Sequence, residues 1–200
     1  MYFRVINKLQ SNLFRIFYKR FFKSFGEKSN ILFPLNINGM KNISIGKGVS
    51  VAYKTWLAAV PHTNEEKCEL VIGNGSSIGN FNHIYATKSI IIGENVLTAD
   101  KVYISDNLHE YEDINVPIIH QHIRQIGTVV IGDGTWIGEN VCIIGVKIGK
   151  NCVIGANSVV TKDIPDYCVV VGSPSYVIKR FCFDTNEWRK TNKMGDFIIS

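Results

Sequence analysis

The chain repeats a six-residue pattern, and this repeat limits the fold more than any other feature. From Ile131 the sequence reads Ile-Gly-Asp-Gly-Thr-Trp and then Ile-Gly-Glu-Asn-Val-Cys. Aliphatic or β-branched residues recur at this step at Ile72, Ile78 and Ile84; Ile92, Thr98 and Ile104; Ile131, Ile137 and Ile143; and Ile148, Ile154 and Val160. An α-helix with 3.6 residues per turn would scatter these positions around its circumference. A short fixed period is typical of a solenoid, so we predict an all-β coil whose aliphatic residues point to its axis.

Small or β-branched residues follow the aliphatic position four residues later, at Thr135, Val141, Cys152 and Ser158, and we expect them to point inward as well. The step from Ile143 to Ile148 is five residues, which predicts a tightened corner without loss of a coil. Residues 53–69 interrupt the repeat and predict a wider coil or a loop. We divide the chain into a basic helix (1–28), a coil (29–182) and a C-terminal tail (183–200).

A second interruption separates Ile104 from Val129, after which the repeat returns in register. A solenoid can extrude a loop at a corner without disturbing its stack, and such loops often carry the binding face. This loop, residues 105–128, includes Ser-Asp-Asn-Leu-His-Glu-Tyr and is rich in Tyr, Ile and Pro, so we expect it to be ordered. A neutral imidazole is well suited to accept a proton at neutral pH, and His109 is therefore the candidate base.

Two runs of this sequence resemble the hexapeptide-repeat acyltransferases. They are Trp-Ile-Gly-Glu-Asn-Val from Trp136 and Val-Ile-Gly-Ala-Asn-Ser-Val-Val-Thr-Lys-Asp-Ile-Pro from Val153. The resemblance extends over roughly residues 40–182 and points to the group that O-acetylates sugars: galactoside, maltose, O-antigen and capsule acetyltransferases. It implies a left-handed parallel β-helix, to which we add an N-terminal amphipathic helix, the extruded loop and a short C-terminal helix. Parallel connections are usually right-handed, so the handedness rests on the resemblance alone.

The resemblance also implies the acceptor side of an active site. His109 stands where these enzymes place their catalytic histidine, within Asp-x-x-His-x-Tyr. Asp106 is the candidate that orients its imidazole, with a turn residue or a solvated charge as the alternative. Asn80 would hold the acceptor or the developing oxyanion, or would simply be a corner residue. Asn82, His83 and Tyr111 are the further candidates for substrate contact, although His83 and Ala86-Thr87-Lys88 depart from the family pattern and leave the sugar unidentified.

The implied acyl donor is acetyl-CoA, bound in a groove between the adjacent β-helices of two chains in a homotrimer. The residues expected along that groove are Trp136, Ala156, Thr161, Lys162, Lys179 and Arg180. Either cation of the last pair would attract the nucleotide phosphates. Thr161 and Lys162 can equally form a solvated strand end, and Trp136 can simply pack at a corner. The implied reaction needs no metal.

The positive charge is concentrated at the N-terminus. Residues 1–28 hold seven basic residues and one acid, whereas the remainder holds 15 basic and 16 acidic residues. On a helical wheel Tyr2, Val5, Ile6, Leu9, Leu13, Ile16 and Phe17 share one side, and Arg4, Lys8, Arg15 and Lys19 share the other. Such a helix either binds a membrane surface through residues 1–25 or packs on the coil or a neighbouring subunit. The rest of the chain offers no basic face for nucleic acid.

Composition favours a cytoplasmic protein, with the inner membrane face as the alternative position. The five cysteines (Cys68, Cys142, Cys152, Cys168 and Cys182) are odd in number and contain no Cys-x-x-Cys, which predicts reduced thiols. We expect Cys152 to be an inward apolar residue. The first residues lack a secretory pattern, and no stretch reaches the ~18 apolar residues of a membrane span.

Several functions therefore compete. The first is acetyl-CoA-dependent O-acetylation of a sugar or glycan precursor in surface polysaccharide synthesis. N-acetylation of an amino sugar is the runner-up, because an amine also needs its proton removed. A metal-dependent lyase like the γ-class carbonic anhydrases would need three histidine ligands, and the spacing of His83 and His109 fits the acetyltransferases better. A non-catalytic assembly module is the last alternative.

Overall fold

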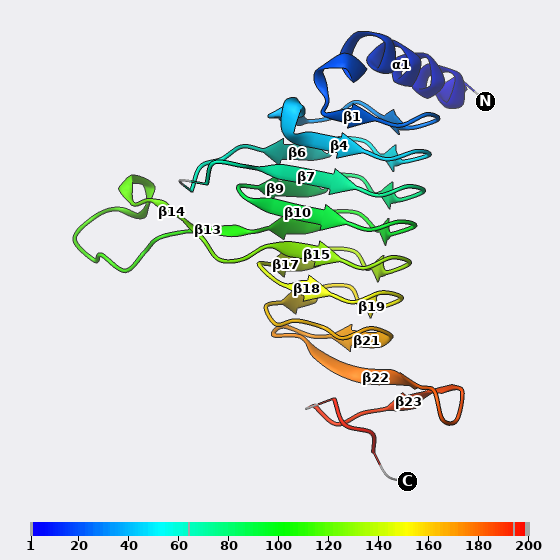
Figure 1. The fold of residues 1–200 in the computed structure, drawn as a ribbon, viewed down its shortest axis with the longest axis vertical. Coiled ribbons are helices and arrows are strands. Elements are labelled where there is room, and N and C mark those ends of the chain that lie inside the picture. Colours follow the sequence, from blue (N-terminus) through cyan, green and yellow to red (C-terminus); the bar gives the residue numbers. More distant parts are fainter. Residues whose placement is uncertain (1, 64, 194, 199–200) are drawn as a thin grey trace.

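The computed structural model describes residues 2–63, 65–193 and 195–198. Its strands stack along one axis in three sheets, and neighbouring strands from β1 to β21 within each sheet are parallel (Figure 1). The chain passes through the sheets in turn, so each circuit adds one strand to each. Sheet A contains β1 (Ser24–Phe25), β4 (Ile43–Ile45), β7 (Glu69–Ile72), β10 (Ser89–Ile92), β15 (Val129–Ile131) and β18 (Lys147–Ile148).

The other two sheets follow the same order along the axis. Sheet B contains β2 (Asn30–Ile31), β5 (Ser50–Val51), β8 (Ser77–Ile78), β11 (Leu97–Thr98), β16 (Trp136–Ile137), β19 (Val153–Ile154) and β21 (Cys168–Val171). Sheet C contains β3 (Asn36–Asn38), β6 (Trp56–Ala59), β9 (His83–Ala86), β12 (Tyr103–Ser105), β17 (Cys142–Ile144) and β20 (Val159–Val160). Six residues therefore correspond to one strand and the corner that follows it on one face of the stack.

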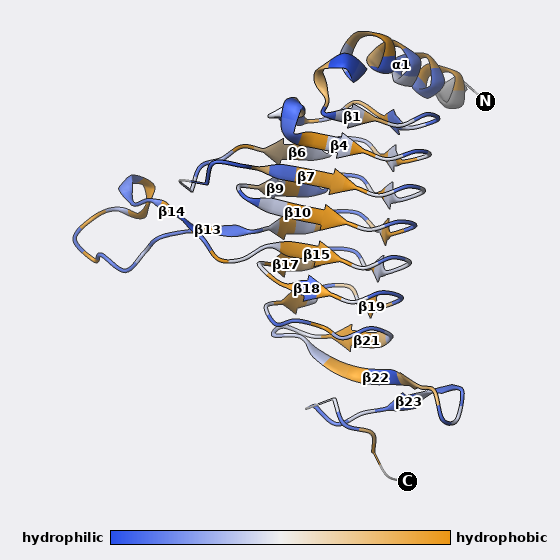
Figure 2. Ribbon diagram, in the orientation of Figure 1, coloured by the Kyte–Doolittle hydropathy of each residue, from blue (hydrophilic) through white to orange (hydrophobic). Residues whose placement is uncertain are grey.

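The core is a column of aliphatic side chains inside the stack. Ile84, Ile104 and Ile143 lie in register on three successive coils, and each has no exposed surface. Figure 2 shows the apolar strands concentrated along the stack. The predicted small inward residues Thr135, Val141, Cys152 and Ser158 are all buried, which confirms that prediction.

Corners between faces need residues that tolerate tight backbone. Asn95, Asn140 and Asn157 have φ values of 53°, 59° and 60°. Asn is tolerated in this left-handed region better than most residues. Glycine follows many inward isoleucines because the next coil passes close by. A Cβ on Gly138 would lie 2.6 Å from the amide nitrogen of Ala156, which leaves no room for a side chain. The Ile-Gly pair is thus explained by burial at one position and close stacking at the next.

The N-terminal helix covers one end of the stack. Helix α1 (Tyr2–Tyr18) is followed by a 3₁₀ turn, η1 (Lys19–Phe21), and β1 already pairs with β4 at Ser24. The helix therefore ends well before residue 28, the predicted limit of the basic segment. Phe22 is buried beside Phe14 and draws the chain into the first coil. A second 3₁₀ turn, η2 (Met40–Asn42), precedes β4.

The C-terminus differs from the prediction. In place of a short helix, β22 (Tyr176–Cys182) pairs antiparallel with β21, and β23 (Glu187–Lys190) pairs antiparallel with β22. Tyr, Val, Ile and Phe in β22 favour extended structure, and the edge of β21 offers unpaired backbone groups. A hairpin, not a helix, therefore ends sheet B.

Replacement of an axial residue should be costly to stability. Ile104→Ala removes a fully buried side chain between two others and should lower the free energy of unfolding by about 2–5 kcal/mol. Leu97→Ala is the matched control, because Leu97 is 48% exposed on sheet B of the same coil. Urea unfolding followed by circular dichroism compares the two. Equal effects of the two changes would contradict the axial packing.

Candidate active site

His109 lies on a two-stranded arm that leaves the stack at the corner after β12. Strand β13 (Asn107–His109) pairs antiparallel with β14 (Ile123–Gln125), and His109 lies opposite Ile123. The Glu110 amide donates to the His122 carbonyl at 2.8 Å, which extends the pairing by one step. The imidazole is exposed, and η3 (Ile118–His120) lies at the outer end of the arm (Figure 1). The candidate base is therefore held by backbone pairing and presented away from the coil.

The arm is anchored by the buried carboxylate of Asp106. One oxygen accepts from the Thr87 amide and hydroxyl, each at 2.8 Å, and from the Asn107 side chain at 3.0 Å. The other accepts from the amides of Lys88 and Ser89 at 2.8 and 2.9 Å. These partners replace the predicted one: the carboxylate binds the corner of the preceding coil and is not bonded to the His109 imidazole. Asp106 thus acts on His109 through the arm's backbone.

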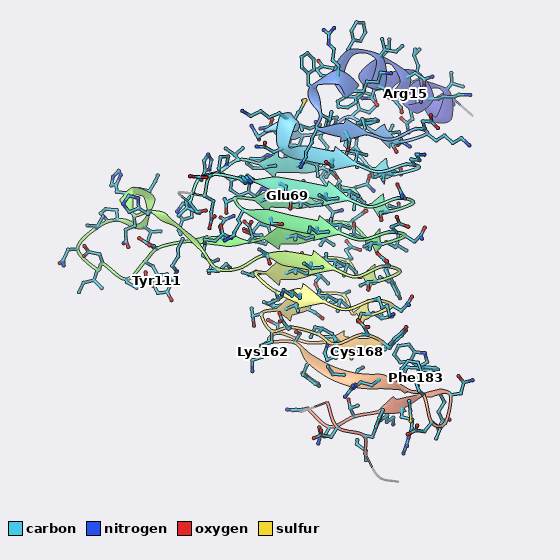
Figure 3. The ribbon with its side chains drawn as sticks, viewed as in Figure 1. Arg15, Glu69, Tyr111, Lys162, Cys168 and Phe183 are labelled. Atoms are coloured by element: carbon cyan, nitrogen blue, oxygen red, sulfur yellow. The ribbon has the colours of Figure 1, made fainter. Side chains whose placement is uncertain are left out.

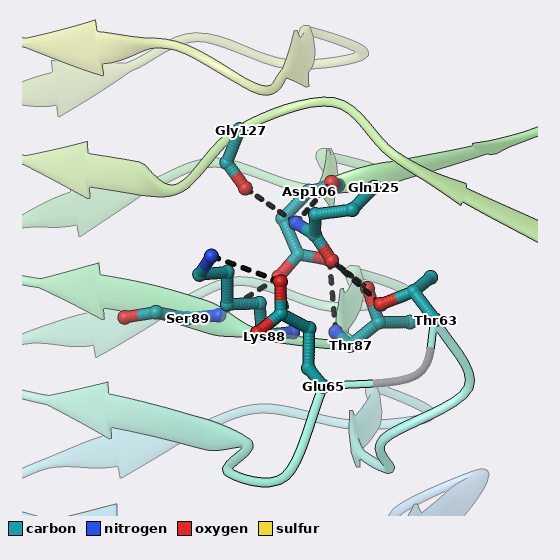
Figure 4. A network of polar contacts seen from close by, with 8 residues as sticks. All are labelled: Thr63, Glu65, Thr87, Lys88, Ser89, Asp106, Gln125 and Gly127. Carbon is teal, nitrogen blue, oxygen red and sulfur yellow. Dashed lines mark hydrogen bonds and ion pairs between the residues drawn. The ribbon is translucent and has the colours of Figure 1, made fainter.

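Gln125 completes this anchor from the second strand of the arm (Figure 4). Its amide group donates to the carbonyl of Asp106 at 2.7 Å and also to the carbonyl of Gly127. Its oxygen accepts from the Thr63 hydroxyl at 2.9 Å and lies 2.8 Å from the Thr87 hydroxyl, whose single proton is shared between Gln125 and Asp106. Loop 60–68 is tied to the same place by an ion pair between Lys88 and Glu65 at 2.9 Å. We name the set Thr63, Thr87, Asp106 and Gln125 the clamp.

The clamp was not predicted from the sequence. Its side chains bind three backbone amides and two backbone carbonyls, and Thr87 and Gln125 stand in no motif. The one available signal was Thr87-Lys88 itself, because these residues stand where the resembled enzymes have an acidic pair. In this chain the corner presents amides to an aspartate from the next coil.

The two predicted asparagines are engaged in corner contacts. The Asn80 side-chain amide donates to both oxygens of Asp100 at 3.1 Å, and its oxygen accepts from the Tyr53 amide at 3.1 Å. Asn82 is 1% exposed, donates to the Ala99 carbonyl at 3.0 Å and accepts from the Val102 amide at 2.9 Å. Asn82 therefore has a structural role in place of the predicted substrate contact. Asn80 is partly exposed, and an acceptor there would compete with Asp100.

His83 belongs to a row of rings on the outer surface of sheet C. Its imidazole stacks on Trp56 with ring centroids 4.3 Å apart and meets Tyr103 edge-on at 5.4 Å. Burial lowers the pKa of the His83 imidazole, and Nε2 is a buried atom without a hydrogen-bond partner. Nδ1 of His62 contacts the hydroxyl of neighbouring Tyr85. The predicted substrate residue His83 is thus neutral, half-buried and packed on its coil neighbours.

The predicted acceptor residues lie at opposite edges of sheet C. Asn80 precedes β9 by three residues, whereas the arm leaves from the other end of β12, which is parallel to β9. Tyr111 lies on the arm and is 60% exposed. The width of the sheet therefore separates Asn80 from His109 and Tyr111 within one chain.

The predicted donor residues also divide into two groups. Trp136 and Lys179 lie on one outward row of sheet B, connected through Val153 and Val169 by the pairing register. Arg180 lies beside Lys179 on β22, and its guanidinium donates to the Gly195 carbonyl at 3.3 Å. Ala156 is exposed at the corner between β19 and β20, and Thr161 and Lys162 are exposed at the next corner, after β20. In Figure 3, Lys162 and Tyr111 project from the same edge of the stack.

A shallow groove adjoins Lys162. It follows the outer surface of sheet A at its C-terminal end and is lined in part by Lys147, Lys150, Asp163 and Pro165. The groove is open and lined by side chains of both charges, so one chain alone does not enclose a ligand there. A second wall would have to come from another molecule.

Two of the cysteines, Cys68 and Cys152, have unreactive thiols. All five are free, and Cys152 is 1% exposed, which confirms the predicted inward position. Burial raises the pKa of the Cys68 thiol to about 12 and that of Cys152 to about 11. These thiols remain protonated at neutral pH and are poor nucleophiles. No group of three or more metal-ligating side chains occurs in the described part of the chain.

Comparisons with known proteins agree with this architecture. The family model described as the hexapeptide repeat of succinyl-transferase matches residues 128–162. A galactoside O-acetyltransferase of Lactococcus lactis is 30% identical over 186 residues, which cover 90% of this chain and 75% of that enzyme. The putative lipopolysaccharide biosynthesis O-acetyl transferase WbbJ of Escherichia coli is 37% identical over 120 residues, 56% of this chain and 61% of that protein.

A solved structure supports the fold. AntD, an N-acyltransferase from Bacillus cereus crystallised with dTDP and 3-hydroxybutyryl-CoA, superposes with a TM-score of 0.69 at 22% identity, covering 81% of this chain and 85% of AntD. The three-sheet stack, the repeat and the similarity to the Lactococcus enzyme define the class. The chain belongs to the hexapeptide-repeat acyltransferase family. It spans only 45% to 61% of the length of four other curated relatives that it matches.

Loss of the Asp106 carboxylate should loosen the arm more than the coil. Asp106→Asn turns one accepting oxygen into a donor facing backbone amides, so a buried donor is left unpaired at a cost of about 1–3 kcal/mol. We expect faster hydrogen exchange in residues 107–125 and faster proteolysis there. Glu112→Gln is the control, because it breaks an exposed pair with Arg124 on the same arm. Unchanged exchange in the Asp106 variant would show that the clamp does not hold the arm.

Proposed function

We propose that this protein is an acetyl-CoA-dependent O-acetyltransferase acting on a sugar hydroxyl of a surface polysaccharide precursor. The observation that carries the proposal is the placement of an exposed histidine on a clamped arm, at the point where the family repeat is interrupted. The lipopolysaccharide role in the name of WbbJ supports the choice of pathway class. The parallel stack is, in this proposal, the left-handed β-helix that the resemblance implies.

His109 acts as the general base. Its imidazole accepts the proton of the acceptor hydroxyl while that oxygen forms a bond to the acetyl carbonyl carbon, and the carbon–sulfur bond then breaks. The departing sulfur takes up a proton and leaves as the CoA thiol, so the imidazole returns to its neutral form. The arm fixes where the imidazole stands, and a fixed geometry is a large part of the rate advantage in such transfers.

The site is completed in a homotrimer. Asn80 and His109 lie at opposite edges of sheet C, and Lys162 and Lys179 lie on different faces, so one chain cannot bring each pair together. The β-helix of a neighbouring chain, placed against the arm, would bring the two members of each pair together. It would also supply the second wall of a groove for the pantetheine arm and the phosphates of CoA. Ile114 is 94% exposed and Ile119 80% exposed on the arm, which supports a covered position for it in the assembly.

N-acylation of an amino sugar is the alternative. The basicity of His109 does not separate the two, because both acceptors lose a proton. A panel of nucleotide sugars, lipid-linked sugars, simple glycosides and their amino-sugar counterparts, assayed by acetyl-CoA consumption, distinguishes them. Turnover confined to amino sugars would replace O-acetylation by N-acetylation, and no turnover with any acceptor would contradict the enzyme proposal.

Loss of the imidazole tests its catalytic role. His109→Ala should lower kcat by at least ~100-fold, the usual scale for loss of a general base. The fold should survive, because the His109 side chain is exposed and its strand is held by backbone bonds. His122→Ala, a second exposed histidine on the arm, is the control. A kcat of the His109 variant within about threefold of the wild-type value would contradict the role of His109 as general base.

The donor side has its own test. Lys162→Glu and Lys179→Glu should each raise KM for acetyl-CoA by about tenfold, because a lost contact to a bound phosphate or carbonyl weakens binding without changing the chemical step. KM for the acceptor should change little. Lys47→Glu, an exposed lysine in an early coil, serves as control. Unchanged KM for acetyl-CoA in both variants would remove these residues from the donor site.

A further inference from the structure

Helix α1 touches the coil with one narrow side only. Phe14 is 8% exposed, stacks on Tyr18 with centroids 4.9 Å apart and meets Phe22 at 6.4 Å. This contact seals the N-terminal end of the core. The helix therefore packs on the coil, which is one of the two alternatives that the sequence left open. This packing uses only part of the helix's apolar surface.

The side of α1 predicted to be apolar faces away from the coil. Its exposed fractions are 63% for Val5, 39% for Ile6, 61% for Leu9, 46% for Leu13, 64% for Ile16 and 58% for Phe17. At 100° per residue these six positions fill one continuous sector of about 120° that excludes Phe14. The side chains of Tyr2 and Arg4, which belong to the predicted pattern, lie outside the described part. We name the six residues the outer face.

Basic residues border the outer face. Lys8 and Arg15 fall on the adjoining sector of the helix, and Lys19 and Arg20 follow in η1. The helix contains no Asp or Glu. In the part of the chain that the structure describes, none of these four cations forms an ion pair. An exposed apolar sector bordered on one side by cations, on a helix without acidic residues, is the arrangement of helices that lie in the plane of a membrane surface.

We propose that the outer face binds the surface of an anionic phospholipid bilayer, with α1 parallel to the membrane plane. Apolar side chains would enter the interface while the cations attract lipid phosphates. No helix in the described residues has both the length and the apolar composition to cross a bilayer. Because Arg15 and Phe183 lie at opposite ends of the stack (Figure 3), the coil would stand with its N-terminal end toward the lipid.

Charge favours lipid over a second copy of the chain as the occupant. A symmetric pairing of two outer faces would bring Lys8, Arg15 and Lys19 of both copies together, and like charges in contact are unfavourable. The remainder of the chain is nearly neutral, with 15 basic and 16 acidic residues, so it supplies no strong countercharge. This inference does not depend on the acetyl-transfer proposal, since binding and turnover are measured separately.

Flotation of the full chain with large unilamellar vesicles tests the proposal. We expect binding to vesicles of phosphatidylcholine with phosphatidylglycerol and at least about tenfold weaker binding to phosphatidylcholine alone, because each basic residue near an anionic surface strengthens attraction. Binding should fall steeply with added salt, which screens such charges. Phe17→Gln with Leu13→Gln, and separately Lys8→Glu with Lys19→Glu, should each weaken binding by about tenfold or more.

Matched variants at the C-terminal end of the molecule distinguish binding through the outer face from nonspecific binding to vesicles. Phe183→Gln removes an aromatic side chain that is 70% exposed, and Lys190→Glu with Lys193→Glu reverses two exposed lysines. Both should bind as the wild type does. Absence of binding to anionic vesicles at low salt overturns the proposal, as does equal loss in the control variants. Light scattering identifies the competing case: dissociation of an oligomer in the Phe17 and Leu13 variant, without vesicle binding by the wild type, would make the outer face a subunit interface.

Discussion

Register between successive coils is the constraint on which the rest of the structure depends. Each inward isoleucine must lie directly over its counterpart, as Ile104 lies between Ile84 and Ile143, because the backbone bonds of all three sheets tie one coil to the next. A residue inserted within a strand would turn every following side chain to the other face. Irregular sequence can therefore leave only at corners, and residues 107–125 do so after β12. The five-residue step from Ile143 to Ile148 is absorbed at Gly145, whose φ is +62°, and β18 still pairs with β15.

An extruded arm creates a second physical problem, because the corner that it leaves has unpaired backbone groups. The Asp106 carboxylate solves it by accepting three amides from Thr87, Lys88 and Ser89 on the preceding coil. A buried carboxylate is tolerated only when it is so bonded. The interactions that stabilise the corner thereby also fix the base of the arm. Stability of the coil and position of His109 are consequently coupled through one side chain.

The periodicity predicted most of the core and the place of the arm from sequence, because burial at a fixed step leaves a direct trace. It missed β6, since Trp56–Ala59 lacks the Ile-Gly pair although Leu57 and Ala59 point inward in register with β9. It also missed the terminal hairpin, because β22 depends on a free sheet edge that no local pattern records. Asp106 was selected as a site residue, but its partners were not predictable: they are backbone amides 17 to 19 residues earlier. A motif specifies side chains, whereas this contact depends on which coil lies next to the corner.

The same stacking is the physical reason why the proposed site draws on more than one chain. Parallel strands carry successive corners to fixed edges, so a residue before a strand and a residue after the paired strand of the next coil are separated by the length of the strand. Asn80, before β9, and His109, after β12, are separated in this way on sheet C. Lys162 and Lys179 are separated because one follows β20 of sheet C and the other lies on β22 of sheet B. A coil has no interior space for a ligand, because its axis is filled by isoleucine and valine. A binding site on such a molecule must lie between an outer face and something placed against it. In the proposed homotrimer, the arm with its exposed isoleucines and its exposed histidine is the part of the chain that contacts the neighbouring subunit.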